Sequence, residues 1–338
     1  MTQECKVHVV NRWWRGLWAL ALLGCTLGGC TALPDTRGFT VATIQLKEAM
    51  GTTGEVVKAE VASASSAGAV PRDDDSIKKL DAAWSATMRS LDAMVAYAKS
   101  IEEIVDAGNR GAESARDVAD SVKRLLDTVS IDVATSASAE VVGVATDTIA
   151  FVYGEYAKHV AAQSLEEALA NFGPSMVRIS ALINAQVTDA RRLFVQQIEF
   201  QVHHLNKPEL YGEWIALNDE LSKLQDSATL QLFALISEGP ARQPAKINEL
   251  KAQLAQLDIV HQNFAPHIAE YNEKLKAIRQ REKAGLSIIG AAENALAIWG
   301  ATQLQLAKAV KERKPVNLDS LIAAVAEVRT LTQRWREL

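Results

Sequence analysis

The chain has 338 residues, of which 48% are hydrophobic and 23% are charged, and its formal net charge is −5. A chain of this length buries enough surface to fold without disulfides, and its mildly acidic balance excludes the basic surface with which proteins bind nucleic acid. Only 18 Gly, 8 Pro and 6% aromatic residues favour helices over a large β-sheet.

The amino terminus has the organisation of an export signal. Residues 1–15 contain Lys6, Arg12 and Arg15 against the single acidic residue Glu4. An apolar run, GLWALALLGCTLGG, follows, and it ends where the polar stretch TALPDTRG begins. A basic region, a short apolar stretch and small residues in this order are typical of secretory signals, and the run is too short to span a membrane as a helix.

A cysteine follows the small residues at the end of the apolar run. The stretch LGGC, formed by Leu27, Gly28, Gly29 and Cys30, resembles the lipobox of bacterial lipoproteins. The resemblance implies that Cys30 is acylated on sulfur, becomes the first residue after cleavage, and is then acylated on its amine. The only cofactor-like group that we expect is therefore this covalent lipid.

A second stretch, LLGC ending at Cys25, competes as the cleavage site. Both stretches offer Leu at −3 and Gly at −1, but Cys30 has the small Gly28 at −2 where Cys25 has the bulky Leu23. Cleavage before Cys30 also uses the whole apolar run and leaves no free thiol in an oxidising compartment. These arguments favour Cys30, with Cys25 as the alternative.

The residue after Cys30 is Thr31, whereas in lipoproteins of Gram-negative bacteria an Asp there marks retention at the inner membrane. The resemblance therefore implies a protein anchored by lipid to the outer membrane and facing the periplasm. Two or three acyl chains hold a protein firmly on a bilayer, whereas one holds it only marginally.

The sequence divides into three predicted regions. These are a signal peptide over 1–29, a lipidated tether with a weak helix and a linker over 30–75, and a helical-bundle domain over 76–338. In the second region, the stretch GTTG is expected to break the helix over 39–62, and SASSAGAVPRDDD over 63–75 has the composition of a linker. We therefore expect residues 39–75 to be loosely attached.

The third region shows the periodicity of long helices. The first of them carries apolar or small residues every seven positions, with a second set three or four positions away, the pattern of a bundle seam: Ile77, Trp84, Leu91, Ala98 and Val105, then Leu80, Thr87, Met94 and Ile101. Prolines and polar clusters separate the expected helices, which cover 76–107, 112–130, 132–171, 175–205, 208–237, 245–283, 285–313 and 318–337.

Pro266 falls inside a helical run and predicts a kink or a split there. No segment alternates with the period of a strand. The predicted fold is therefore all-α, an elongated antiparallel bundle of long helices that is tethered by lipid at its amino terminus.

No residue pattern points to catalysis or to a metal. His203 and His204 are adjacent and would point about 100° apart on a helix, while His261 and His267 are six positions apart. The stretch GNRG over 108–111 is explained by a turn between helices. We predict a chain that is not an enzyme and that has no metal site.

Two segments, 133–162 and 284–307, are unusually apolar. Each could be a helix of the core or, as in proteins that resemble helical pore-forming toxins, a membrane-inserting hairpin. Glu140, Asp147 and Glu155 interrupt the first segment, and charges are costly inside a bilayer, which favours the core.

The predicted function is that of a non-catalytic, lipid-anchored scaffold or adaptor for another periplasmic or membrane component. Its partners would be the membrane, through the lipid, and a protein of the envelope, but no nucleic acid. A membrane-active protein that inserts an apolar helix is the alternative, and a binder of a small apolar ligand between helices stays open.

Overall fold

The computed structural model describes residues 34–66, 74–107, 111–136, 139–159, 162, 164–239 and 242–337. The elements within these ranges are all helical, and no strand occurs among them. In chain order they are α2 (Arg37–Ser66), α3 (Asp74–Asp106), α4 (Ala112–Ser136), α5 (Ala139–His159), α6 (Leu165–Leu205), the π-helix η1 (Pro208–Gly212), α7 (Glu213–Ser237), α8 (Pro244–Glu312) and α9 (Asp319–Trp335).

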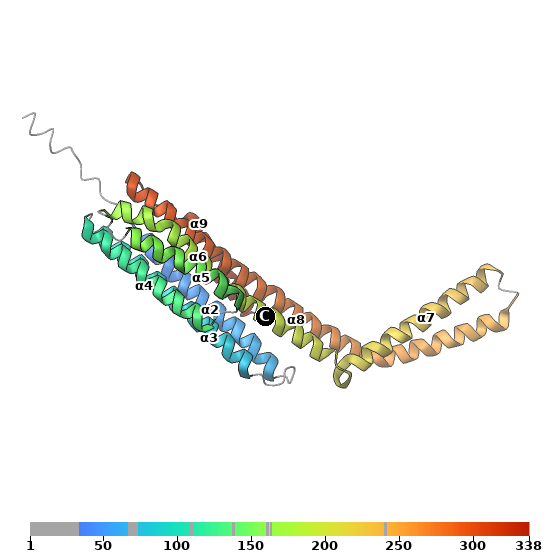
Figure 1. Ribbon diagram of the computed structural model, residues 1–338. Coiled ribbons are helices and arrows are strands. Elements are labelled where there is room, and N and C mark those ends of the chain that lie inside the picture. Colours follow the sequence, from blue (N-terminus) through green and yellow to red (C-terminus); the bar gives the residue numbers. More distant parts are fainter. Residues whose placement is uncertain are drawn as a thin grey trace, which may run out of the picture.

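Most of these helices lie side by side in one elongated bundle (Figure 1). Helix α6 contacts α2, α3, α4, α5 and α8, so it lies at the centre of the bundle. It has 41 residues and is therefore about 60 Å long. The predicted all-α fold and elongated antiparallel bundle are confirmed.

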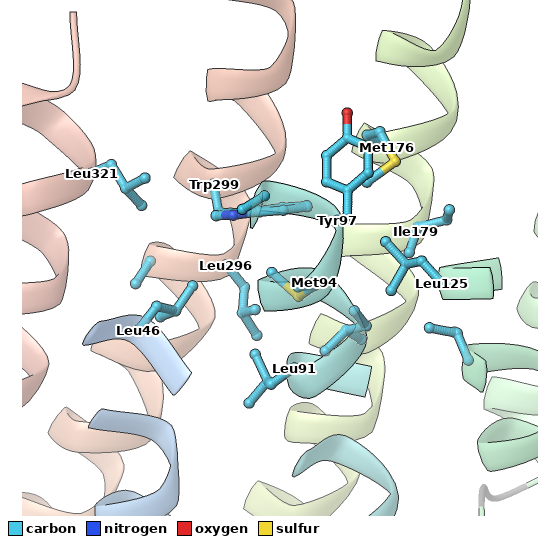
Figure 2. Close-up of a cluster of buried hydrophobic side chains, with 14 of the residues drawn as sticks. Leu46, Leu91, Met94, Tyr97, Leu125, Met176, Ile179, Leu296, Trp299 and Leu321 are labelled. Carbon is cyan, nitrogen blue, oxygen red and sulfur yellow. The ribbon is translucent and has the colours of Figure 1, made fainter. Parts of the chain in front are cut away.

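Trp299 of α8 lies at the middle of the core. Its ring is fully buried, stacks on Phe39 of α2 with 5.9 Å between ring centroids, and meets Tyr97 of α3 edge to face at 6.3 Å. Its Nε1 donates a hydrogen bond to Oγ1 of Thr43 at 2.9 Å. Figure 2 shows side chains of six helices pointing into this core, among them Leu46, Met94, Leu125, Ile179, Leu296 and Leu321.

The heptad pattern of α3 is confirmed wherever its side chains are described. All of the following seam residues are buried: Trp84, Thr87, Leu91, Met94, Ala98, Ile101 and Val105. They face α2, α4 and α6, the helices that α3 contacts.

The expected break in the helix over 39–62 is wrong, and so is the loose attachment of this region. Helix α2 continues through GTTG, and its residues Phe39, Leu46 and Met50 are fully buried in the common core. Gly54 lies so close to Trp84 that any Cβ would overlap the indole ring. The glycine thus serves close packing of α2 against α3, and the bundle begins at α2. The rest of the predicted linker, 67–73, lies outside the described residues.

Two prolines lie inside long helices. Pro174, which was expected to separate two helices, lies within α6, and Pro266, which was expected to kink or split a helix, lies within α8. The helices predicted over 245–283 and 285–313 are also one helix, α8. Both proline rings are exposed, so the carbonyl that loses its amide partner can bind water instead. Helix α8 is not split, although its ribbon changes direction where it leaves the bundle (Figure 1).

The helix predicted over 132–171 is also divided differently. Helix α4 continues to Ser136, α5 ends at His159, and α6 begins at Leu165. Ser164 caps α6, because its Oγ accepts a hydrogen bond from the backbone N–H of Glu167 at 3.2 Å. This cap could have been read from the sequence SLEE.

Replacing Gly54 by Ala should cost about 1–3 kcal/mol in the free energy of unfolding, because the added methyl group overpacks the contact with Trp84. Gly290 is the matched control, since nothing lies within 4 Å of a Cβ placed there, and Gly290→Ala should gain up to about 1 kcal/mol through helix propensity. Urea denaturation followed by circular dichroism measures both changes. Equal stability of the two variants would contradict the close packing at Gly54.

Candidate interaction arm

A helical hairpin projects from the bundle (Figure 1). We call this hairpin the arm, and it comprises η1, α7 and the part of α8 from Pro244 to Ile278. Within the described chain, α7 contacts only η1 and α8, so the arm has no support from the other helices of the bundle along α7. Most residues of α7 are exposed or half-buried.

The arm is an antiparallel two-stranded coiled coil. The less exposed residues of each of the two helices recur with alternating spacings of three and four residues, which is the geometry of a coiled-coil seam. On α7 and the preceding turn they are Tyr211, Trp214, Asn218, Leu221, Gln225, Ala228, Leu232 and Leu235, and on α8 they are Ile247, Leu250, Leu254, Leu257, His261, Phe264, Ile268, Tyr271, Leu275 and Ile278.

This seam is narrow and partly polar. Of the residues of α7, only Ala228 is fully enclosed, and Asn218, Gln225 and His261 occupy seam positions near the middle of the arm. Polar residues at such positions fix the register of a coiled coil but lower its stability. The arm therefore depends on additional contacts at its base.

A hydrogen-bonded network fixes the base of the arm. The hydroxyl of Tyr211 donates to Oε1 of Glu270 at 2.5 Å, and Nζ of Lys274 donates to the Tyr211 oxygen at 2.7 Å. Lys274 also pairs with Glu270 at 2.9 Å. The bonds from Lys274 and then Tyr211 lower the pKa of Glu270, and the bonds to Glu270 and then Tyr211 raise the pKa of Lys274.

Aromatic rings hold the first turn of α7 against α8. The ring of Trp214 stacks on His267, with 4.3 Å between centroids and 13° between planes, and it packs against Phe264 at 5.1 Å. His267 is thus part of a stack, and His261 lies in the seam. His203 and His204 lie in the last turn of α6. In the part of the chain that is described, no three His, Cys, Asp or Glu residues come together as a metal site.

A pocket of about 490 Å³ lies at the base of the arm. A second hollow, of about 360 Å³, lies between α3 and α4 beside Arg89 and Arg124. Each of these two hollows offers space for the small ligand that the sequence leaves open. The walls of the first hollow are formed by the network and the aromatic stack, and include His204, Leu205, Glu209, Leu210, Tyr211 and Trp214.

Exposed apolar side chains concentrate on the arm. Leu230 and Phe233, with 70% and 67% of their surface exposed, are the most exposed large hydrophobic residues in the described chain, and Ile236 is 43% exposed. We call these three residues the tip patch. No charged residue occurs from Ser227 to Ser237, so the end of α7 is uniformly uncharged.

The segment 284–307, which was predicted as either core or membrane-inserting, lies in the bundle core. Ile289, Trp299 and Leu306 are fully buried there, and the single charge, Glu293, accepts a hydrogen bond from Arg191 at 3.2 Å. Among the described helices, α8 alone is long and apolar enough to cross a membrane, and half of its apolar window is buried in the protein.

The segment 133–162 is described in part. Within it, Val152 of α5 is fully buried, and the guanidinium of Arg178 lies 3.6 Å from the centroid of the Phe151 ring. Glu155 pairs with Lys158 at 2.9 Å and with His159 at 3.2 Å. This part of the segment is therefore a helix packed on the bundle, with Glu155 paired to its neighbours on α5.

The predicted lipidation residues Cys25, Leu27, Gly28, Gly29 and Cys30 lie outside the described residues. The first helix after them, α2, begins at the end of the bundle that is remote from the arm. Its start contacts the last turn of α3 and the turn between α8 and α9, through an ion pair between Arg37 and Asp106 at 3.1 Å and packing of Gly38 on Leu318.

No family model, curated protein or solved structure matches the chain. The arm itself was missed by sequence reasoning, because its heptads resemble those of the bundle helices. The uncharged stretch from Ser227 to Ser237 and the polar seam residues are the signals that could have identified it. The case for function therefore depends on geometry.

The base of the arm should loosen in acid. The pKa of Glu270 lies below its ordinary value of 4.5 in the folded chain, so its bonds stabilise the base above that value and are lost as the pH falls through the lowered pKa. Amide protection factors in η1 should fall between pH 6 and pH 3 more than those in α6. In Glu270→Gln this extra fall should be absent, and its persistence would assign it to another group.

Proposed function

We propose that this chain is a non-catalytic, lipid-anchored protein of the Gram-negative cell envelope, and that it acts as a helical scaffold or adaptor for another periplasmic or membrane component. The observation that carries the proposal is the placement of the arm at one end of the bundle and of the start of α2 at the other. A lipid on Cys30 would fasten the end that is remote from the arm.

The helices form a spacer of considerable length. Helix α8 has 69 residues and extends from the tip of the arm to the end of the bundle where α2 begins, so its contour measures about 100 Å. The bend in α8 shortens the direct distance. Lipid at one end of this spacer would hold the tip far from the surface of the anchoring membrane.

The surface of the arm has the character of a protein contact. Patches of exposed large hydrophobic residues on a soluble surface mark interaction sites, and the tip patch lies where nothing else in the described chain covers it. The bundle, by contrast, fills its own core, with Trp299 and Phe39 fully enclosed. These features support an adaptor that binds through its arm.

The alternative, a membrane-active protein that inserts 284–307, has no specific observation in its favour. Insertion would withdraw Ile289, Trp299 and Leu306 from the bundle core and would break the contact of Glu293 with Arg191. Moving a charge to the middle of a bilayer costs about 2.5–3.5 kcal/mol on the mildest scale.

Replacing Cys30 by Ala should abolish incorporation of labelled palmitate and leave uncleaved precursor, because no sulfur remains at the acylation site. Cys25→Ala is the matched control and should be processed and labelled normally. Metabolic labelling followed by gel electrophoresis measures both. If Cys25→Ala failed to be labelled while Cys30→Ala was processed, the cleavage site would be the one before Cys25.

A photoreactive amino acid at Phe233 should form covalent protein adducts in intact cells, because this position is the exposed centre of the tip patch. Ile322 on α9, with 48% of its surface exposed, is the matched position on the bundle and should form far fewer adducts. Adducts are detected by electrophoresis and mass spectrometry. Equal yields at the two positions would contradict a binding role for the arm.

A further inference from the structure

We propose that the arm pairs with the arm of a second copy of this chain, in antiparallel orientation, about a two-fold axis beside Gln225 and Asp226. This inference goes beyond the proposed function, because it assigns to the arm a second copy of this chain and not a different protein of the envelope. Two observations carry it. One is a row of four residues on α7, Ile215, Ser222, Thr229 and Ile236, whose order of large and small side chains is the same in both directions, and the other is the distribution of charge along the arm.

The row lies on one flank of the coiled-coil seam and repeats every seven residues. Ile215, Ser222 and Thr229 are half-buried, and Ile236 is exposed. Reversing the row leaves its pattern unchanged, with large residues at the ends and small ones in the middle. In an antiparallel pair of arms, Ile215 would meet Ile236 of the second copy and Ser222 would meet its Thr229.

Such a contact is isologous, meaning that each copy contributes the same surface and every contact occurs twice. The midpoint of the Ile215–Ile236 pair coincides with the midpoint of the Ser222–Thr229 pair. One axis therefore satisfies both sets of contacts without a shift in register.

The two central hydroxyls suit a close approach of helices. The Oγ of Ser222 donates to the carbonyl of Asn218 at 2.8 Å, and the Oγ1 of Thr229 donates to the carbonyl of Gln225 at 2.7 Å. Because each hydroxyl already donates within α7, covering it with another helix leaves no donor unsatisfied. Their small size allows the backbones of the two α7 helices to come near one another.

The charges of the arm are separated along its length. From Glu213 to Asp226 the shaft of α7 carries four acidic residues and one lysine. The stretch from Arg242 to Lys251, which leads into the first turns of α8, carries three basic residues and one glutamate. Within one arm, these basic turns of α8 lie beside the uncharged end of α7.

Antiparallel pairing brings the opposite charges together. Lys251 follows the seam residue Leu250 as Ile215 follows Trp214, so heptad spacing puts both on the same flank. In an antiparallel pair, Lys251 would approach Asp219 of the second copy, which also pairs with Lys223 on its own helix. A parallel pair would instead place each basic tip beside the other and each acidic shaft beside the other. Electrostatic complementarity therefore selects the antiparallel orientation.

Pairing also gives the arm a buried interior, which a single hairpin lacks. A single hairpin encloses only Ala228 of α7, while two hairpins together form a four-helix arrangement with an interior of its own. Phe233 and Ile236 of each copy would then lie near the shaft of the other. This arrangement accounts for the exposure of these two apolar residues of α7.

Cysteine cross-linking in the full chain tests the orientation. Two differently tagged copies are co-expressed, one carrying Ile215→Cys and the other Ile236→Cys, and disulfides between copies are measured after mild oxidation. The mixed pair should cross-link. Neither variant should cross-link with itself, because positions 21 residues apart on α7 lie about 30 Å apart.

The matched control is Leu217→Cys with Glu238→Cys, which are also 21 residues apart and lie on the opposite flank of the seam. This pair should give no disulfide between copies above the background of the native cysteines. Asp226→Asn provides an independent test, because Asp226 of each copy lies nearest the axis. Removing this like-charge contact should raise the yield of the mixed disulfide roughly two- to fivefold.

Self-cross-linking of Ile236→Cys as strong as that of the mixed pair would overturn the antiparallel register. An unchanged yield in Asp226→Asn would overturn the position of the axis. If no disulfide forms while the photoreactive group at Phe233 captures a different protein, the second-copy proposal fails and the adaptor proposal stands. If that group captures only lipid or nothing, both proposals fail.

Discussion

The continuity of α8 is the constraint on which the rest of the structure depends. One uninterrupted helix supplies Trp299 to the middle of the bundle core and Phe264 to the aromatic stack of the arm. Because a helix transmits orientation along its axis, the position of the arm relative to the bundle is set by the bundle packing of α8 and by the network at Tyr211. Breaking α8 would leave two independent units.

This continuity could not be foreseen from the sequence, although most of the fold could. The heptads of α3 predicted its buried face because packing there follows the periodicity of large apolar residues. Pro174 was expected to end a helix and Pro266 to kink or split one, but both residues are exposed, and the packing of the remaining residues outweighs one lost hydrogen bond. A proline therefore does not end a helix where the other residues of that helix are well packed against their neighbours.

Glycine was misinterpreted for a related reason. In GTTG it suggested a break, since glycine has a low helix propensity, yet Gly54 lets α2 come close to Trp84. A single sequence cannot distinguish a glycine that ends a helix from one that admits a large neighbour, because the neighbour is distant along the chain. The bundle therefore begins with α2 and not at residue 76, where the sequence predicted its start.

The arm shows the same limit for the candidate site. Its heptads were visible, but a heptad specifies that a helix has a partner and does not specify which helix, so α7 was indistinguishable from a bundle helix. In the structure, α7 differs from the bundle helices because it packs along one narrow seam, against α8, and leaves the rest of its surface exposed. Only the structure shows that most of the surface of Leu230 and of Phe233 is exposed.

The polar seam gives this exposure a physical rationale. If Asn218, Gln225 and His261 were leucines, the hairpin would be more stable by itself and less specific in register. With polar residues there, the two helices are held in one alignment at a cost in stability, while the seven-residue spacing along α7 keeps Ile215, Ser222, Thr229 and Ile236 on a single flank. A hairpin of low stability and fixed register is well suited to pairing with another surface. Its fixed register presents an ordered row of contacts, and the burial of that row in a complex would stabilise the hairpin further.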